Sequence, residues 1–254
     1  FRADSGFIPR VDMRRVEGVL YKIFWGKADG WFTQLWLGAE TEVVYDHNGR
    51  LTDREISLGG VYLGPWQTTV NGLFSMNKEL FRGKLYDLTQ LVFFSESKPA
   101  GGVQLSLTGA LGDRIDYSND RKASGTMLMP SAGLNVTRHL NFNLSHAFER
   151  LGFEGQEIYT ANLTQLRGIY NFNVRAFIRA IIQYRHVTRN SALYSFPVQT
   201  KSSSVFSQLL FSYKINPQTV LFIGYSDNYL SFQGIELSQT DRTFFFKIGY
   251  ALVL

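Results

Sequence analysis

Cysteine is absent from this sequence, so neither disulfide bonds nor thiolate metal sites can form. Long hydrophobic runs are absent too, because no stretch approaches the roughly 18–20 apolar residues that a membrane-spanning helix requires. Proline is scarce, with 6 residues in a chain of 254. The lack of long apolar runs excludes membrane insertion by helices. Membrane insertion by β-strands stays possible, because the strands of a membrane barrel alternate apolar and polar residues and contain no long apolar run.

Aromatic residues and glycines are plentiful. The chain has 21 Phe, 13 Tyr and 4 Trp, as expected if aromatic girdles line two membrane interfaces, and its 23 Gly suit tight turns between strands. The net charge of +5 is consistent with a basic lumen or with contacts to lipid headgroups. Nucleic-acid binding is the alternative for a basic chain. Because no Lys/Arg run or recognised motif supports it, we expect no nucleic-acid partner.

The end of the sequence, RTFFFKIGYALVL (Arg242 to Leu254), alternates strictly between large apolar residues and smaller, partly polar ones. Successive side chains of a strand point to opposite faces, so this segment has one greasy face and one mixed face. A soluble protein rarely ends on such an open edge, whereas a transmembrane barrel strand needs lipid-facing and lumen-facing sides. The predicted lipid-facing residues are Phe244, Phe246, Ile248, Tyr250, Leu252 and Leu254.

The same period-2 pattern recurs in Trp31–Tyr45, Trp66–Asn77, Val103–Gly112, Leu140–Phe148 and Val174–Thr188. The last of these predicts a ladder of three arginines on one face, which motivates a hypothesis of anion preference. An ordinary solvated face of a soluble sheet is the alternative interpretation. The candidate lumen-facing residues are Glu40, Glu42, Gln67, Asn71, Gln104, Arg175, Arg179, Gln183, Arg185 and Lys247.

The predicted connections between these segments alternate between short and long, which favours a barrel with short periplasmic turns and longer extracellular loops. Short ones include Gly64–Pro65 and Lys98–Gly102, and longer ones include Asn77–Lys84, Arg150–Gln156 and Arg189–Ser203. The predicted fold is therefore an all-β, transmembrane, antiparallel up-and-down β-barrel.

The pattern predicts about thirteen to fourteen strands, and their parity bears on the whole barrel. If the last strand ends in the periplasm, the first visible strand, about Arg14 to Trp25, also runs downward from outside. Single-chain bacterial barrels usually have an even number of strands with both termini periplasmic. Either at least one strand is therefore missing upstream of Phe1, or residues Phe1 to Pro9 contribute one. We interpret residues 1–254 as the C-terminal portion of a larger outer-membrane barrel.

Several motifs resemble the DUF5916 proteins of Gram-negative bacteria. They are DSGFIPRVDMRR (Asp4–Arg15), RGIYNFNVRAFIRAIIQY (Arg167–Tyr184), FSYKINPQTVLFIGYSDNY (Phe211–Tyr229) and TDRTFFFKIGYALVL (Thr240–Leu254). The resemblance implies a large outer-membrane barrel preceded by a carbohydrate-binding-like domain of the family 9 type. It also implies that the GFIPR element falls well inside the barrel. It implies no established reaction or substrate.

The terminal strand also resembles the signal that the outer-membrane barrel-assembly machinery recognises. A polar residue, a glycine two positions on and two apolar residues near the end correspond to Lys247, Gly249, Leu252 and Leu254, although a terminal Phe is commoner than Leu. Such a strand is a free edge that can pair with the machinery before the barrel closes. The expected partners are this machinery, outer-membrane lipid with lipopolysaccharide, and other subunits of an envelope complex.

Catalytic and metal-binding motifs are weak. His47 follows Asp46 in a predicted loop, where a loop-surface role is the favoured interpretation. Ser145 and His146 are neighbours on one strand and point to opposite faces, so they cannot form a nucleophile–base pair. An oxygen-rich segment with no EF-hand spacing contains Asp113, Asp116, Asn119 and Asp120. We therefore predict no catalytic residues, no metal and no cofactor.

Three functions stay open. The first is passive or gated passage of a solute or polymer, with a carbohydrate-related cargo as one option. The second is a scaffold barrel that anchors a carbohydrate-binding domain or a partner subunit. The third is an outer-membrane hydrolase that uses His47 or a nearby loop carboxylate.

Overall fold

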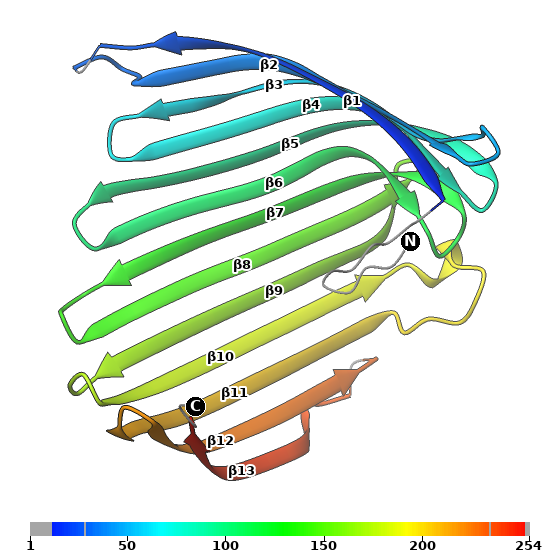
Figure 1. Cartoon of the computed structure of the whole chain (residues 1–254). Helices are drawn as coiled ribbons and strands as arrows, with labels where there is room; N and C mark the ends of the chain where they lie inside the picture. The colour runs from blue at the N-terminus through cyan, green and yellow to red at the C-terminus, as the bar shows by residue number, and fades with distance from the viewer. Residues whose placement is uncertain (1–11, 28, 234, 252–254) are drawn as a thin grey trace.

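A computed structural model describes residues 12–27, 29–233 and 235–251, which form one antiparallel sheet of 13 strands. Each strand is hydrogen-bonded to the next in chain order (Figure 1). This confirms the predicted all-β, up-and-down topology. The strands are β1 (Met13–Trp25), β2 (Gln34–Asp46), β3 (Leu51–Gly64), β4 (Thr68–Phe81), β5 (Lys84–Ala100), β6 (Val103–Asp116), β7 (Arg121–Asn135), β8 (Leu140–Phe153), β9 (Gln156–Asn171), β10 (Ala176–Arg189), β11 (Lys201–Asn216), β12 (Thr219–Phe232) and β13 (Ser238–Tyr250).

The strand register separates polar from apolar residues onto the two faces of the sheet. Leu58 of β3 lies opposite Phe74 of β4, whereas their neighbours Ser57 and Ser75 form the next pair on the other side. We call the side of Leu58 the apolar face and the side of Ser57 the polar face. Leu58 and Phe74 are 55% and 43% exposed, while Ser57 and Ser75 are 0% and 3% exposed. Side chains are more crowded on the concave side of a curved sheet than on its convex side. The low exposure of Ser57 and Ser75 therefore places the polar face on the concave side.

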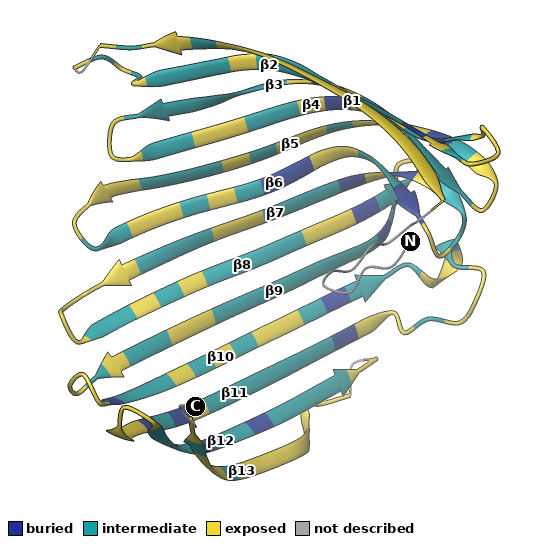
Figure 2. Cartoon of the chain, in the orientation of Figure 1, coloured by how far each residue is buried: buried dark blue, intermediate teal, exposed yellow. Residues whose placement is uncertain are grey.

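The apolar face has no second layer packed on it in the described part of the chain. Its exposed residues include Leu20, Leu105, Leu144 and Ile182, from strands spread across the sheet. Figure 2 shows buried residues as short, scattered segments of the strands. The buried apolar clusters are small, and one of them consists of Tyr86, Leu88 and Ile115. The chain therefore turns its apolar residues outward and its polar residues inward, the reverse of a water-soluble sandwich.

Aromatic rings lie over glycines of the neighbouring strand at four cross-strand pairs. A Cβ atom at Gly109 would come within 2.2 Å of the ring of Phe93, which faces it in the register. Glycine thus leaves room for the ring to lie against the next backbone, a device that fixes strand pairing. The pairs are Tyr21 with Gly38, Phe93 with Gly109, Phe142 with Gly168, and Phe245 with Gly224.

The connections do not sort by length as the sequence predicted. We call the end of the sheet that carries residues 190–200 the long-loop rim, and the other end the opposite rim (Figure 1). The long-loop rim also carries two-residue turns at Arg82–Gly83 and Glu154–Gly155, whose positive φ values fit type I′ hairpins. The prediction was wrong because β4, β5, β8 and β9 stay paired up to this rim, although their ends are polar.

The sheet is open within the described residues. β1 pairs with β2 and β13 pairs with β12, and the strand order does not join β1 to β13. The closed barrel expected from the sequence is therefore not shown. In a sheet of 13 alternating strands the first and last run in the same direction, so antiparallel closure needs an odd number of additional strands.

Exposed tryptophans gather at the opposite rim. Trp25 ends β1 there, Trp31 lies in the connection to β2, and Trp66 lies in the turn between β3 and β4; their exposed fractions are 73%, 68% and 69%. Trp31 also stacks on Tyr62, with ring centroids 5.8 Å apart. Tryptophan and tyrosine concentrate in this way where a protein meets a membrane–water interface. Among the described residues, no helix has the length and apolar character needed to cross a membrane.

Candidate functional site

The polar face brings together most of the predicted lumen residues. Cross-strand pairing sets the side of each: Glu42 lies opposite Glu55, and Gln104 lies opposite Gly133. By strand alternation the following predicted residues share this face: Glu40, Glu42, Asn71, Gln104, Arg179, Gln183, Arg185 and Lys247. Their assignment to a lumen stays a prediction, because the sheet is open.

Two predicted lumen residues lie in turns. Gln67 adopts a positive φ of 53° in the connection between β3 and β4, so the predicted strand from Trp66 begins at Thr68 instead. Arg175 precedes β10. The side chain of Asn173 accepts hydrogen bonds from the backbone N–H groups of Arg175 and Ala176 at 2.8 and 3.0 Å, which forms an Asx turn. The arginine ladder in β10 therefore consists of Arg179 and Arg185, and the asparagine was the signal that the strand starts later.

Carboxylates line the polar face of β1 to β4, and most of them have partners. The guanidinium group of Arg15 bridges Glu17 and Glu42 at 2.8 and 2.6 Å. The hydroxyl of Tyr21 donates to Glu40, and that of Ser57 donates to Glu55 at 2.5 Å. Glu17, Glu42 and Glu55 are direct cross-strand neighbours. Because opposed like charges destabilise a sheet, Arg15 and these hydroxyls offset a repulsion that the register creates.

Cations line the polar face of β9 to β13, and several have no carboxylate partner. Arg179 donates to the amide oxygen of Gln208 at 3.0 Å. Side-chain hydrogen bonds and ion pairs within the described residues do not involve Arg167, Arg185 or Lys247. The polar face is thus divided into an acidic side on the first strands and a basic side on the last ones.

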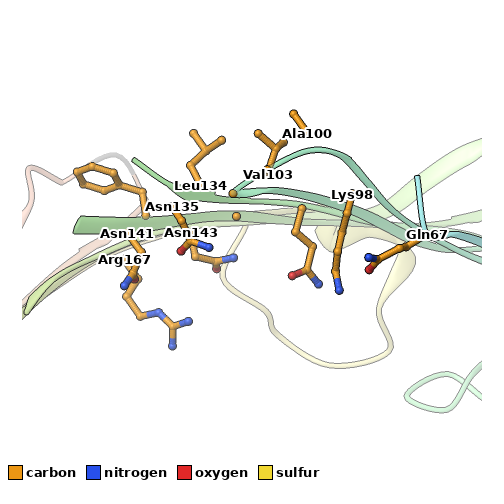
Figure 3. Close-up of a pocket in the computed structure, with 14 residues that line it drawn as sticks. Gln67, Lys98, Ala100, Val103, Leu134, Asn135, Asn141, Asn143 and Arg167 are labelled. Atoms are coloured by element: carbon orange, nitrogen blue, oxygen red, sulfur yellow. The ribbon is translucent and has the colours of Figure 1, made fainter. Parts of the chain in front are cut away.

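A polar hollow of about 590 Å³ opens on this face near the opposite rim. Figure 3 shows Gln67, Lys98, Asn143 and Arg167 on one side of the sheet, with Val103, Leu134 and Ala100 on the other. The hollow spans the turn after β3 and strands β5 to β9. Sequence reasoning found Gln67 and Gln104 but missed Lys98, Asn143 and Arg167. The alternation of Gln165 and Arg167 with Leu166 between them was the available signal for Arg167.

The connection 190–200 is held over the polar face at the long-loop rim. Arg121 of β7 donates to the backbone oxygen of Leu193 at 2.6 Å and to Asp116 at 3.0 Å, and its guanidinium lies 4.3 Å from the ring centroid of Phe153. The backbone N–H of Ser195 donates to Asn119 at 3.1 Å. A buried cluster consists of Ala123, Leu151 and Ile158, with Phe153, Tyr159, Leu193 and Tyr194 packed against it.

The pKa values of two tyrosine hydroxyls at this rim are raised. Burial raises the pKa of Tyr194 within the connection. Burial also raises the pKa of Tyr117, and its hydrogen bond to Glu79 at 2.9 Å adds to the effect. Both phenols are therefore neutral hydrogen-bonding groups around neutral pH.

The final strand places Phe244, Phe246, Ile248 and Tyr250 together on the apolar face, with exposed fractions from 58% to 72%. Gly249 lies on the other face, opposite Val220. Leu252 and Leu254, which were part of the predicted assembly signal, lie outside the described residues. Recognition by the assembly machinery stays a prediction.

The candidate catalytic and metal-binding residues are dispersed. His47 lies in the turn after Asp46, the last residue of β2. Ser145 lies opposite Ser131, whereas His146 contacts Thr164 at 2.8 Å on the other face. The oxygen-rich segment is a strand end and a hairpin turn, since Asp113 and Asp116 belong to β6 while Asn119 and Asp120 lie in the turn. The described residues contain no group of three or more His, Asp or Glu side chains placed to hold a metal ion.

Comparison with known proteins gives structural likeness alone. No family model and no curated protein matches the chain. The chain is similar to in-vitro folded OmpT, an outer membrane protein of Vibrio cholerae, over 96% of this chain and 98% of that chain, with 10% identity and a TM-score of 0.44. Outer-membrane expressed OmpT of Vibrio cholerae matches over the same shares with 10% identity and a TM-score of 0.45.

Proposed function

We propose that this chain is the C-terminal portion of a bacterial outer-membrane β-barrel that lets a hydrophilic solute pass along its polar face. The observation that carries the proposal is the inverted placement of residues. Leu58 and Phe74 are exposed on the apolar face while Ser57 and Ser75 are buried on the polar face. A bilayer accommodates the exposed apolar residues, and polar side chains on the opposite face are typical of a barrel lumen. The exposed tryptophans of the opposite rim fit one membrane interface.

Additional strands complete the barrel in this proposal. An odd number of strands between β13 and β1 makes every pair antiparallel and gives the even total that is usual for bacterial barrels. Strands upstream of residue 1 are the proposed source, as the resemblance to the DUF5916 proteins implies.

The basic side of the polar face supports a preference for anions. Arg185 has no acidic partner among the described residues, and Arg179 is paired with an amide. Such groups lower the energy of an anion in a pore. The acidic side has Arg15 between Glu17 and Glu42, which offsets part of its charge.

The test is to reconstitute the longest natural form of the protein in planar bilayers and to measure conductance and reversal potential in a KCl gradient. We expect open channels with a reversal potential on the anion-selective side. The double variant Arg179→Gln/Arg185→Gln shifts it toward cation selectivity, whereas Arg175→Gln, in a turn outside β10, leaves it near the wild-type value. Absence of conductance removes the channel proposal, and cation selectivity of the wild type removes the anion preference.

A scaffold barrel is the second candidate, and connection 190–200 favours it. Held by Arg121 over the polar face, this connection narrows any passage beside β7 to β9. A scaffold predicts a protein without conductance that leaves the membrane in a stable complex, for example with a carbohydrate-binding domain, on gentle detergent extraction.

A further inference from the structure

The hollow on the polar face is built from groups with unused hydrogen-bonding capacity. Gln67, Lys98, Gln104 and Arg167 line it, and none of their side chains has a hydrogen-bond or ion-pair partner among the described residues. Asn143 makes one bond, donating to Ser131 at 3.3 Å. Amides offer both donors and acceptors, and the two cations offer donors alone. The hollow can therefore engage a ligand that is rich in hydroxyl groups and carries negative charge.

Glycines shape this hollow. In the strand register, Gln104, Gly133, Asn143 and Arg167 form one row of directly opposed residues across β6 to β9. Gly133 has no side chain between Gln104 and Asn143, and a Cβ atom added there would meet Gln104 no closer than 3.8 Å. The row is thus an amide, an empty position, an amide and a guanidinium, which leaves space directly over the backbone of β7.

The charged residues that line the hollow are of one sign. Its lining contains the cations Lys98 and Arg167 and no carboxylate. The register places the carboxylate of Glu96 on the same face, where it lies opposite Ser106 and Thr69. Glu96 does not line the hollow. The guanidinium group of Arg167 on β9 and the ammonium group of Lys98 on β5 lie at opposite ends of this space, and each favours a carboxylate or phosphate group by charge-assisted hydrogen bonds.

We propose that this hollow is a binding site for a small anionic polyol, that is, a sugar bearing a carboxylate or a phosphate group. Arg167 holds the anionic group at one end of the hollow, while Asn143 and Gln104 hydrogen-bond the hydroxyls and Lys98 and Gln67 contact the other end of the ligand. The proposal deepens the proposed function and rests on it in one respect, namely that the polar face is open to the aqueous passage.

The experiment measures binding to the longest natural form of the protein, refolded in detergent micelles, by isothermal titration calorimetry. The probes are D-galacturonate and D-glucose 6-phosphate, which distinguish a carboxylate from a phosphate ligand. D-galactose, acetate and inorganic phosphate test whether charge and hydroxyls are both needed. We expect at least one of the two charged sugars to bind about tenfold or more tightly than galactose and than the simple anions.

Two variants test the charge and the free space of the site separately. Arg167→Gln removes the charge and keeps a hydrogen-bonding side chain, and Gly133→Leu fills the space without altering any charge. Each weakens binding of the charged sugar about tenfold or more. Arg175→Gln, at the same rim but outside the hollow, is the control and leaves the affinity unchanged. Retained mobility shift between heated and unheated samples on gels shows that each variant is folded.

The outcomes separate this site from the channel. Equal affinity for galactose or for inorganic phosphate, no binding of either charged sugar, or unchanged affinity in folded Arg167→Gln and Gly133→Leu overturns the site. Conductance without binding overturns the site and leaves the channel standing. Binding without conductance supports the site and removes the channel.

Discussion

Replacing Arg121 by alanine releases connection 190–200 and destabilises the long-loop rim. The guanidinium group of Arg121 joins three elements, because it donates to Asp116 of β6 at 3.0 Å and to the backbone oxygen of Leu193 at 2.6 Å, and it lies over Phe153 of β8. The Asp116 side chain is 4% exposed, and that of Arg121 is 21% exposed. The variant therefore leaves a buried carboxylate without its cation.

The expected cost follows from these contacts. Removing one partner of a buried ion pair costs roughly 3–5 kcal/mol. Asp116 keeps a hydrogen bond from the side-chain amide of Asn119 at 2.8 Å, which lowers the penalty. We therefore expect Arg121→Ala to reduce the free energy of unfolding by about 3 kcal/mol, at the lower end of that range. In an Asp116→Asn background no buried carboxylate loses its cation, so Arg121→Ala reduces the free energy of unfolding by only about 1–1.5 kcal/mol.

The assay is urea unfolding of the protein in lipid vesicles, followed by tryptophan fluorescence, together with protease cleavage within residues 190–200. Lys122→Ala is the matched control. Its ion pair with Asp113 measures 2.8 Å, but the side chains are 47% and 27% exposed, so the expected cost is at most about 1 kcal/mol. The reasoning is refuted if Arg121→Ala costs no more than Lys122→Ala and leaves the connection equally resistant to protease.

Two further predictions concern the faces of the sheet. Gly109→Ala places a Cβ atom within 2.2 Å of the Phe93 ring and destabilises the protein by about 1–3 kcal/mol, whereas Gly72→Ala, with no atom within 4 Å, changes the unfolding free energy by less than about 0.5 kcal/mol. Leu58→Arg puts a charge on the apolar face and costs about 2–4 kcal/mol in vesicles, while Asn71→Arg on the polar face costs far less. Urea titrations check both pairs, and equal effects within a pair contradict the assigned contact or face.

The local pattern of residues determined the strands and their two faces. Phe244, Phe246 and Ile248 alternate with smaller or polar residues, and β13 places them together on the apolar face as predicted. Alternation is a local property, since each backbone step reverses the side-chain direction. It was therefore sufficient to predict the all-β fold and the side of residues such as Glu42 and Arg179.

Strand ends depended on turn chemistry that alternation does not contain. The side chain of Asn173 turns the chain before β10 and removes Arg175 from the arginine ladder. Type I′ turns at Arg82–Gly83 and Glu154–Gly155 extend the pairing to the rim and remove the predicted long loops there. Both effects are local, but the competing polar pattern obscured them.

Contacts between distant segments were decided by the tertiary structure alone. The strand register brings Gln104, Gly133, Asn143 and Arg167 into one row, although they come from four strands. Arg121 reaches Leu193 across 72 positions of the sequence. A period-2 pattern fixes which face a residue occupies, but it leaves open which residue of the next strand lies opposite, because a shift by two residues preserves both faces. The sequence by itself therefore determined the two-faced sheet, and only the packed strands determined the hollow and the anchored connection.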